Sequence, residues 1–233
     1  MRASLLLALG AALALPGTAR PASPVLYVAL GDSTAAGIGA EQGGGYPDRL
    51  ARRLGASGVP VRLVNLAVPG ATAEDVRRTQ VPKLLADHPA LVTIGIGLND
   101  ALLGRPLAEF ARDLEVLADM VAHAKAAVVF SELPDVSRSS AAAGSPLALA
   151  RRIAAYNATI RRVAERHGFV VGALEEVSRR AFRERPDLLA RDGLHPSARG
   201  YELWADALWP AIERALAPRV QARRPAPPAG AKR

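Results

Sequence analysis

Val25-Leu26-Tyr27-Val28-Ala29-Leu30 is an apolar run that stops abruptly at Gly31-Asp32-Ser33. An apolar run rich in β-branched and aromatic residues and bounded by turn residues predicts a buried strand. In open α/β sheets, ligands bind outside the carboxyl ends of the strands. Ser33 therefore stands where a nucleophile would be useful. The alternative interpretation is a polar turn in which Ser33 only caps the helix that follows.

Four further apolar segments alternate with helical patterns along the 233 residues. Strands alternating with helices predict a parallel sheet covered by helices on both faces, which is a three-layer α/β/α sandwich. The sequence shows no internal repeat and no second domain, so we expect one folded domain over residues 23–216. The further predicted strands are 61–65, 91–96, 127–131 and 169–171, and the main predicted helices are 46–54, 106–125, 146–167 and 197–216.

Residues 1–22 are typical of a secretory signal peptide. Arg2 forms a basic start, residues 4–15 form an apolar stretch too short to span a bilayer, and small residues precede a cleavage site near Ala19. A retained N-terminal anchor or a buried helix is the alternative. We expect a secreted, periplasmic or cell-envelope protein.

The net charge of +8 is concentrated in the last residues of the chain. Residues 217–233 hold five basic residues, several prolines and no acid, and we expect a disordered tail there. Two interpretations of this tail stay open: peripheral contact with an anionic envelope, and a solvated end. The charge gives no reason to expect a nucleic-acid partner, and we expect a monomer. The chain has no cysteine, which excludes disulfides, a thiolate nucleophile, a lipid-anchored cysteine and a cysteine zinc site.

A base and an acid lie close together near the C-terminus, in Asp192-Gly193-Leu194-His195. A serine hydroxyl attacks only with the help of a base, and a neutral histidine oriented by a carboxylate is such a base. The oxyanion formed in acyl transfer needs fixed N–H donors, which Gly70 and Asn99 can supply after two other predicted strands. The remaining histidines are interpreted as structural; they are His88, His123 and His167.

Together these motifs resemble the SGNH/GDSL hydrolases, a family of serine esterases and lipases. Gly31-Asp32-Ser33 is similar to the first block of the family, and Gly70 to the glycine of the second. Gly97-Leu98-Asn99-Asp100 matches the third block, and the segment from Asp192 to His195 matches the last. The blocks occur in the family's order over residues 25–216. Thr34 stands where many members have leucine, which is outside the catalytic letters.

The resemblance implies a flavodoxin-like five-stranded sheet with strand order 2-1-3-4-5, and it implies no metal and no cofactor. It makes Ser33 the nucleophile, His195 the general base and then the acid, and Asp192 the residue that orients His195. The oxyanion hole would combine the backbone N–H groups of Ser33 and Gly70 with the side chain of Asn99.

Two acids beside these motifs have alternative interpretations. Paired carboxylates can do glycosidase chemistry or bind a metal, whereas we expect Asp32 to brace the turn through backbone N–H groups. We expect Asp100 to support Asn99 or to cap a helix. Other signatures are absent: Ala35 breaks a Gly-x-Ser-x-Gly elbow, and Gln42 replaces the third glycine of a dinucleotide fingerprint.

The predicted function is that of an exported serine esterase or lipase acting through an acyl-serine intermediate. Candidate substrates are small-molecule, lipid or carbohydrate esters: short acyl esters, lysophospholipids, thioesters and O-acetyl sugars. The loops 37–45, 102–106 and 137–145 are predicted to shape the acyl pocket. Two alternatives stay open, namely acyl transfer to a sugar hydroxyl and a non-catalytic envelope-binding protein that uses the basic tail.

Overall fold

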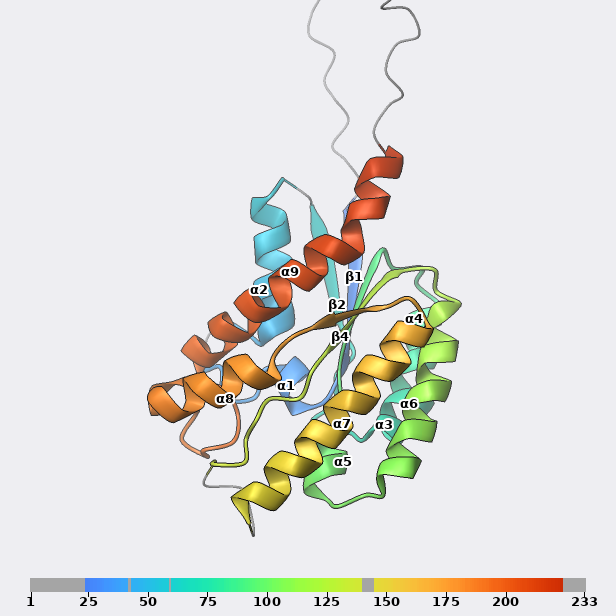
Figure 1. The fold of residues 1–233 in the computed structure, drawn as a ribbon. Helices are drawn as coiled ribbons and strands as arrows, with labels where there is room; N and C mark the ends of the chain where they lie inside the picture. The colour runs from blue at the N-terminus through green and yellow to red at the C-terminus, as the bar shows by residue number, and fades with distance from the viewer. Residues whose placement is uncertain (1–23, 42, 59, 140–144, 224–233) are drawn as a thin grey trace, which may run out of the picture.

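The computed structural model describes residues 24–41, 43–58, 60–139 and 145–223. Parallel strands of these residues form one sheet in the order β2-β1-β3-β4-β5, which confirms the flavodoxin-like order (Figure 1). The bounds of β2 and β4 are as predicted, and those of the other strands differ by one residue. The strands are β1 (Val25–Gly31), β2 (Val61–Asn65), β3 (Leu91–Gly95), β4 (Ala127–Ser131) and β5 (Val170–Gly172).

Helices cover both faces of the sheet, so the three-layer sandwich is confirmed. In Figure 1, α2 and α9 lie on one side of the strands and α6 and α7 on the other. The first face carries α1 (Ser33–Ala36), α2 (Tyr46–Ala56) and α9 (Ala198–Arg223). The second face carries α3 (Ala73–Asp75), the π-helical turn η1 (Val76–Gln80), α4 (Val81–Leu85), α5 (Leu98–Leu102), α6 (Leu107–Ala122) and α7 (Pro146–Arg166).

Strand β1 is buried on both faces because it lies in the middle of a parallel sheet between two helical layers. Val28 and Leu30 belong to the core under α6 and α7, whereas Tyr27 and Ala29 belong to the core under α2 and α9. A continuous apolar run is what this position requires, since successive side chains point to opposite faces. The strand therefore delivers Asp32 and Ser33 to the carboxyl edge of the sheet.

Two segments differ from the sequence-based expectation. Helix α8 (Glu175–Glu184), followed by the short 3₁₀ turn η2 (Pro186–Leu188), was not predicted. Its apolar face is short, because only Val177, Ala181 and Phe182 of its residues are apolar and each of them is half-buried. Helix α9 continues to Arg223, so the prediction of a disordered tail from residue 217 is wrong over residues 217–223. Extending an existing helix avoids the cost of nucleation, which explains this continuation.

The terminal predictions fall mainly on other residues. The predicted signal peptide, residues 1–22, and the end of the tail, residues 224–233, lie outside the described residues. None of the helices in the described part of the chain combines the length and the apolar character that a bilayer crossing needs.

Candidate active site

Ser33 is the first residue of α1, directly after the strand end that the sequence singled out. The N-cap of this helix is Asp32, whose Oδ1 accepts hydrogen bonds from Thr34 N at 2.9 Å and Thr34 Oγ1 at 2.8 Å. Asp32 therefore braces the turn as predicted, and the alternative in which Ser33 is the cap is wrong. Burial raises the pKa of Asp32 to about 6, against the hydrogen bonds from Thr34 and the charge of His195.

Gly31 leaves room for the turn before Ser33. A Cβ atom at this position would lie 2.4 Å from the carbonyl oxygen of Gly95, its partner in β3, and the backbone has a φ of 153°. Both facts require glycine, since a side chain would push apart the ends of β1 and β3. The close approach fixes the strand end from which Ser33 projects.

The structure brings Ser33, His195 and Asp192 into one chain of hydrogen bonds. Ser33 Oγ lies 2.8 Å from His195 Nε2, and His195 Nδ1 lies 2.6 Å from Asp192 Oδ2. With the imidazole proton on Nδ1, the ring donates to Asp192 and accepts from the serine hydroxyl. Ser33 is far from the other two in sequence, and the arrangement is that of a nucleophile, a base and a carboxylate that orients the base.

Asp192 also holds the backbone of its own turn. Its Oδ1 accepts from Leu194 N at 2.9 Å and from His195 N at 3.0 Å. Burial works to raise the pKa of Asp192, but the hydrogen bond with the His195 side chain and these two backbone hydrogen bonds outweigh it and hold the pKa below its ordinary value. The carboxylate that faces the imidazole is therefore ionised at neutral pH.

The loop that carries His195 is fixed from two sides. On one side, Leu189 forms an antiparallel bridge with Pro196, and Ala190 N donates to His195 O at 2.8 Å. On the other side, Gly39 packs so closely that a Cβ there would lie 2.7 Å from Pro196 O and 3.0 Å from His195 Cβ. His195 thus meets Ser33 in one geometry.

Gly70 and Asn99 follow β2 and β3, the neighbours of β1 in the sheet. Asn99 Nδ2 donates to Ala71 O at 2.9 Å, which ties the loop after β3 to the residue next to Gly70. In the described part of the chain, neither the backbone N–H of Ser33 nor that of Gly70 donates a hydrogen bond. Asn99 Nδ2 keeps a second N–H, so all three donors predicted for an oxyanion hole are available.

The comparison with known proteins agrees with this geometry. Residues 29–203 match the model of the GDSL-like Lipase/Acylhydrolase family. The chain belongs to this family. Esterase TesA of Pseudomonas aeruginosa is 28% identical over 215 residues, which cover 90% of this chain and 98% of TesA.

Solved structures are similar as well. A crystal structure of TesA matches with a TM-score of 0.69 and 25% identity, over 82% of this chain and 99% of that chain. The lipase/acylhydrolase from Enterococcus faecalis matches with a TM-score of 0.65 and 26% identity, over 84% and 96%. The protein is therefore a carboxylic ester hydrolase of the GDSL-like family.

Asp100, the last residue of the third motif, supports the start of α3 in this GDSL-like hydrolase, in addition to the N-cap Thr72. It is fully buried, and its Oδ2 accepts from Ala73 N at the start of α3 at 3.0 Å. Its Oδ1 accepts from Arg105 Nη1 at 2.8 Å. Burial raises the pKa of Asp100, against these two interactions. Since Asp32 and Asp100 each have structural partners, the interpretation as a glycosidase pair has no support, and the described residues contain no side-chain cluster that could hold a metal ion.

The other histidines have partners on their own or neighbouring helices, or lie in a turn. His123 Nδ1 lies 2.9 Å from Asp119 O, and His167 Nε2 lies 3.0 Å from a Glu115 carboxylate oxygen. His88 is an exposed turn residue with a φ of 48°. The structural interpretation of these three is consistent with their positions, and His195 is the histidine that contacts Ser33.

Gln80 is a residue of the site that the sequence analysis missed. It lies in η1, only 1% exposed, and hydrogen-bonds the backbone of Gly31, two residues before Ser33. A lone glutamine among charged residues carries no motif. The π-helical turn that points it at β1 is a tertiary feature that helical periodicity does not reveal.

Proposed function

We propose that this protein is an exported serine esterase that cleaves carboxylic esters through an acyl-Ser33 intermediate. The observation that carries the proposal is the hydrogen-bonded chain from Ser33 Oγ to His195 Nε2, and from His195 Nδ1 to Asp192. This chain stands at the carboxyl edge of the sheet, where α/β folds bind ligands.

Acylation begins when Ser33 Oγ attacks the ester carbonyl carbon and its proton passes to His195 Nε2. The imidazolium is stabilised by the ionised Asp192 at 2.6 Å from Nδ1. The tetrahedral intermediate collapses by breaking the bond to the alcohol oxygen, which takes the proton from Nε2. The products of this half-reaction are the free alcohol and the acyl-Ser33 ester.

The negative charge of the tetrahedral intermediate falls on the former carbonyl oxygen. We assign its stabilisation to the backbone N–H groups of Ser33 and Gly70 and to the free N–H of Asn99 Nδ2. Fixed donors of this kind act only where charge develops, and removal of one typically lowers kcat by about 10²–10³. The hydrogen bond from Asn99 to Ala71 keeps the amide in place before substrate binds.

Deacylation repeats these steps with water. His195 Nε2 takes a proton from water, the hydroxide attacks the acyl carbon, and Ser33 Oγ leaves with the proton that His195 returns. A sugar hydroxyl in the same place would give acyl transfer instead of hydrolysis. Partition of product towards an added sugar acceptor is the measurement that separates these two outcomes.

The substrates we propose are short acyl esters, lysophospholipids, acyl thioesters and O-acetyl sugars. The printed names of the relatives, an esterase and a lipase/acylhydrolase, agree with an ester substrate and go no further. Export is supported by the basic start and the apolar run of residues 1–22. N-terminal sequencing of the protein from the culture medium or periplasm should find a new terminus near Arg20, and a terminus at Met1 would contradict export.

A panel of p-nitrophenyl esters of increasing chain length tests the mechanism, with Ser33→Ala as the key variant. In the wild type, a fluorophosphonate should label Ser33 covalently, and mass spectrometry should locate the label on the peptide that contains Ser33. We expect Ser33→Ala to lose both turnover and this labelling. Ser57→Ala, which changes an exposed serine at the end of α2, should behave like the wild type. Wild-type turnover in Ser33→Ala would sink the proposal.

A further inference from the structure

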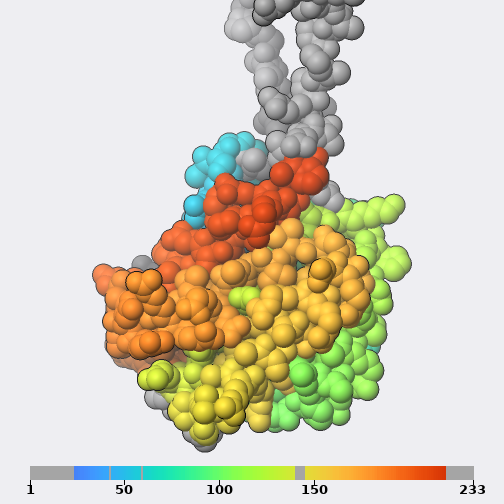
Figure 2. Space-filling model, viewed as in Figure 1, coloured from blue at the N-terminus to red at the C-terminus, as the bar shows by residue number. Residues whose placement is uncertain are grey.

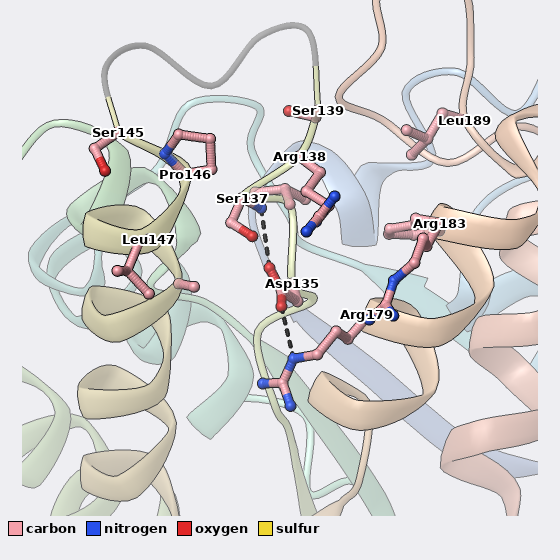
Figure 3. Close-up of a pocket in the computed structure, with 13 residues that line it drawn as sticks. Asp135, Ser137, Arg138, Ser139, Ser145, Pro146, Leu147, Arg179, Arg183 and Leu189 are labelled. Atoms are coloured by element: carbon pink, nitrogen blue, oxygen red, sulfur yellow. Dashed lines mark hydrogen bonds and ion pairs between the residues drawn. The ribbon is translucent and has the colours of Figure 1, made fainter.

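A pocket with a volume of about 450 Å³ opens between the segment after β4, the start of α7 and the side of α8 that carries Arg179, Phe182 and Arg183. Figure 2 shows α7 in yellow and α8 in orange as neighbours on this face of the molecule, and Figure 3 shows the pocket between them. Its apolar wall includes Val136, Leu147, Ala150, Phe182 and Leu189. Of the three loops predicted to shape an acyl pocket, only 137–145 contributes described residues to it.

The polar lining has an excess of positive charge. The charge of Arg179 is already compensated, because its Nε donates to Asp135 Oδ2 at 2.8 Å and its terminal nitrogens pair with Glu175 and Glu176 of α8, which do not line the pocket. Hydrogen bonds from Ser137 and Arg179 hold the pKa of Asp135 below its ordinary value, although burial acts first to raise it. Arg138 and Arg183 also line the pocket, and neither forms an ion pair within the described residues. Two unneutralised guanidinium groups remain.

Figure 3 shows these two arginines on different elements. Arg138 extends from the segment after β4 towards the side of the pocket that α8 forms, and Arg183 projects from α8 itself. The lining also holds an unused hydrogen-bonding group, since Ser139 Oγ is buried without a partner in the described part of the chain. Guanidinium forks match the planar oxygens of carboxylates and phosphates.

The pocket is close to the catalytic histidine. Leu189, which lines it, forms a β-bridge with Pro196, the residue after His195. Bridged residues have Cα atoms about 5 Å apart and consecutive residues about 3.8 Å, so the Cα atoms of Leu189 and His195 lie within about 9 Å of each other. One wall of the pocket therefore belongs to the segment that also pairs with the backbone beside His195.

We propose that this pocket binds an anionic group of the ester substrate, so that the enzyme prefers esters that carry a carboxylate or a phosphate over neutral esters of the same size. The apolar wall accepts the hydrocarbon part, and Arg138, Arg183 and Ser139 bind the anion. This inference rests on the proposed function and adds a substrate class to it. The anion can belong to the acyl chain or to the alcohol, and matched substrates distinguish the two.

The test uses two pairs of substrates with the purified full chain. Mono-p-nitrophenyl adipate against p-nitrophenyl hexanoate places the anion on the acyl side. The butyryl ester of glycerol 3-phosphate against that of glycerol places it on the alcohol side. We expect a higher kcat/KM for the anionic member of one pair, and the pair that shows it identifies the side that enters the pocket.

The variant Arg138→Ala/Arg183→Ala should lower kcat/KM for that anionic ester by about 10- to 100-fold, mainly through KM, because charged hydrogen bonds are lost. Hydrolysis of the neutral partner should change by less than about twofold. Arg180→Ala is the matched control: it removes one charge from the same helix α8, outside the pocket, and should change neither value. Arg138→Lys/Arg183→Lys should restore part of the preference.

The outcomes separate this inference from the proposed function. No preference for either anionic ester, or a preference that survives the double variant, would overturn the anion subsite while Ser33-dependent hydrolysis of neutral esters still stands. Loss of neutral and anionic hydrolysis to the same degree in a folded double variant would also overturn it. Hydrolysis that does not depend on Ser33 would instead contradict the proposed function.

Discussion

The side-chain amide of Gln80 pairs with both polar backbone groups of Gly31. Gln80 Oε1 accepts from Gly31 N at 2.9 Å, and Gln80 Nε2 donates to Gly31 O at 2.8 Å. The amide thus replaces a strand partner at the end of β1, where the chain must leave the sheet for the turn to Ser33. Both hydrogen bonds are buried. Gly31 O also accepts from Val68 N at 3.1 Å, so it is the N–H of Gly31 that depends on Gln80, because a buried N–H cannot turn to water instead.

We expect Gln80→Leu to lower the free energy of unfolding by about 1–3 kcal/mol, since it leaves the buried N–H of Gly31 without an acceptor, whereas Gly31 O still accepts from Val68 N. We also expect a larger fold-change in kcat, which should fall, than in KM, because the turn that holds Ser33 loses its support. Urea unfolding and ester kinetics measure the two effects. Gln80→Glu keeps the acceptor for Gly31 N but places a carboxylate against Gly31 O, and it should be impaired in the same way.

Thr79→Ala changes the exposed neighbour of Gln80 on the same π-helical turn and is the control for disturbance of that turn. It should retain kcat within about twofold, as surface substitutions usually do. If Gln80→Leu also kept the stability and kcat of the wild type, the positioning role of Gln80 would be wrong.

The sheet could be predicted from sequence because each strand is a short apolar run between turn residues. The run from Val25 to Leu30 is apolar on both faces. In an α/β fold, a run of this kind is typical of a central strand that is covered by helices on both faces. Helix α8 was not predicted this way, because its apolar face has only Val177, Ala181 and Phe182. Its remaining contacts come from polar residues such as Ser178, whose Oγ accepts from Asp135 N at 2.8 Å. Periodicity detects helices whose apolar stripe continues over several turns.

The candidate site divides in the same manner. Ser33, Asp192 and His195 could be predicted because their chemistry needs specific residue types at specific spacings, and the sequence contains them in order. The roles of Gln80 and Arg138 depend on which distant residues the fold brings next to them. Neither residue belongs to a motif that would mark it in the sequence. The limit of the sequence analysis is therefore the contact between distant segments, not the identity of the catalytic groups.

The amide of Asn99 is expected to stabilise the transition state and to contribute little to substrate binding. Asn99→Ala should lower kcat by about 10²–10³ and leave KM within a few-fold, because the oxyanion forms only during the reaction. Steady-state kinetics with a p-nitrophenyl ester measures both constants.

The matched control for this variant is Asn65→Ala. Asn65 Nδ2 donates to Ala35 O at 2.8 Å, a hydrogen bond of the same kind as that from Asn99 to Ala71. We expect this control to reduce stability by about 1 kcal/mol and to retain most of kcat. Equal losses of kcat in the two variants would indicate that Asn99 supports the loop and does not contact the oxyanion.

The charge of Asp192 can be separated from its role in the turn. Asp192→Asn keeps an oxygen that can accept from Leu194 N and His195 N, but it loses the ionised partner of His195 Nδ1. We expect kcat to fall by about 10²–10⁴ with little change in thermal stability, since the base loses its correct tautomer and the stabilisation of the imidazolium. Asp192→Ala should lose stability as well as kcat. A wild-type kcat in Asp192→Asn would remove Asp192 from the catalytic mechanism.

The raised pKa of Asp32 predicts a pH dependence of stability. Burial raises the pKa from 3.8 to about 6, so the folded protein holds this proton more tightly than the unfolded chain does. The resulting stabilisation is complete below about pH 4 and is lost as the pH rises through about 6. Asp32→Asn keeps the acceptor for Thr34 N and cannot ionise, so its stability relative to the wild type should increase by about 1–3 kcal/mol between about pH 4 and pH 7.

Chemical unfolding of both proteins across this pH range measures the difference, in which the contributions of all other titrating groups cancel. The exposed Asp87→Asn corrects for the change in net charge. A difference in packing between the amide and the carboxyl group changes the free energy of unfolding by the same amount at every pH. A difference that stays constant over the whole range would therefore show that Asp32 does not bind its proton more tightly in the folded state.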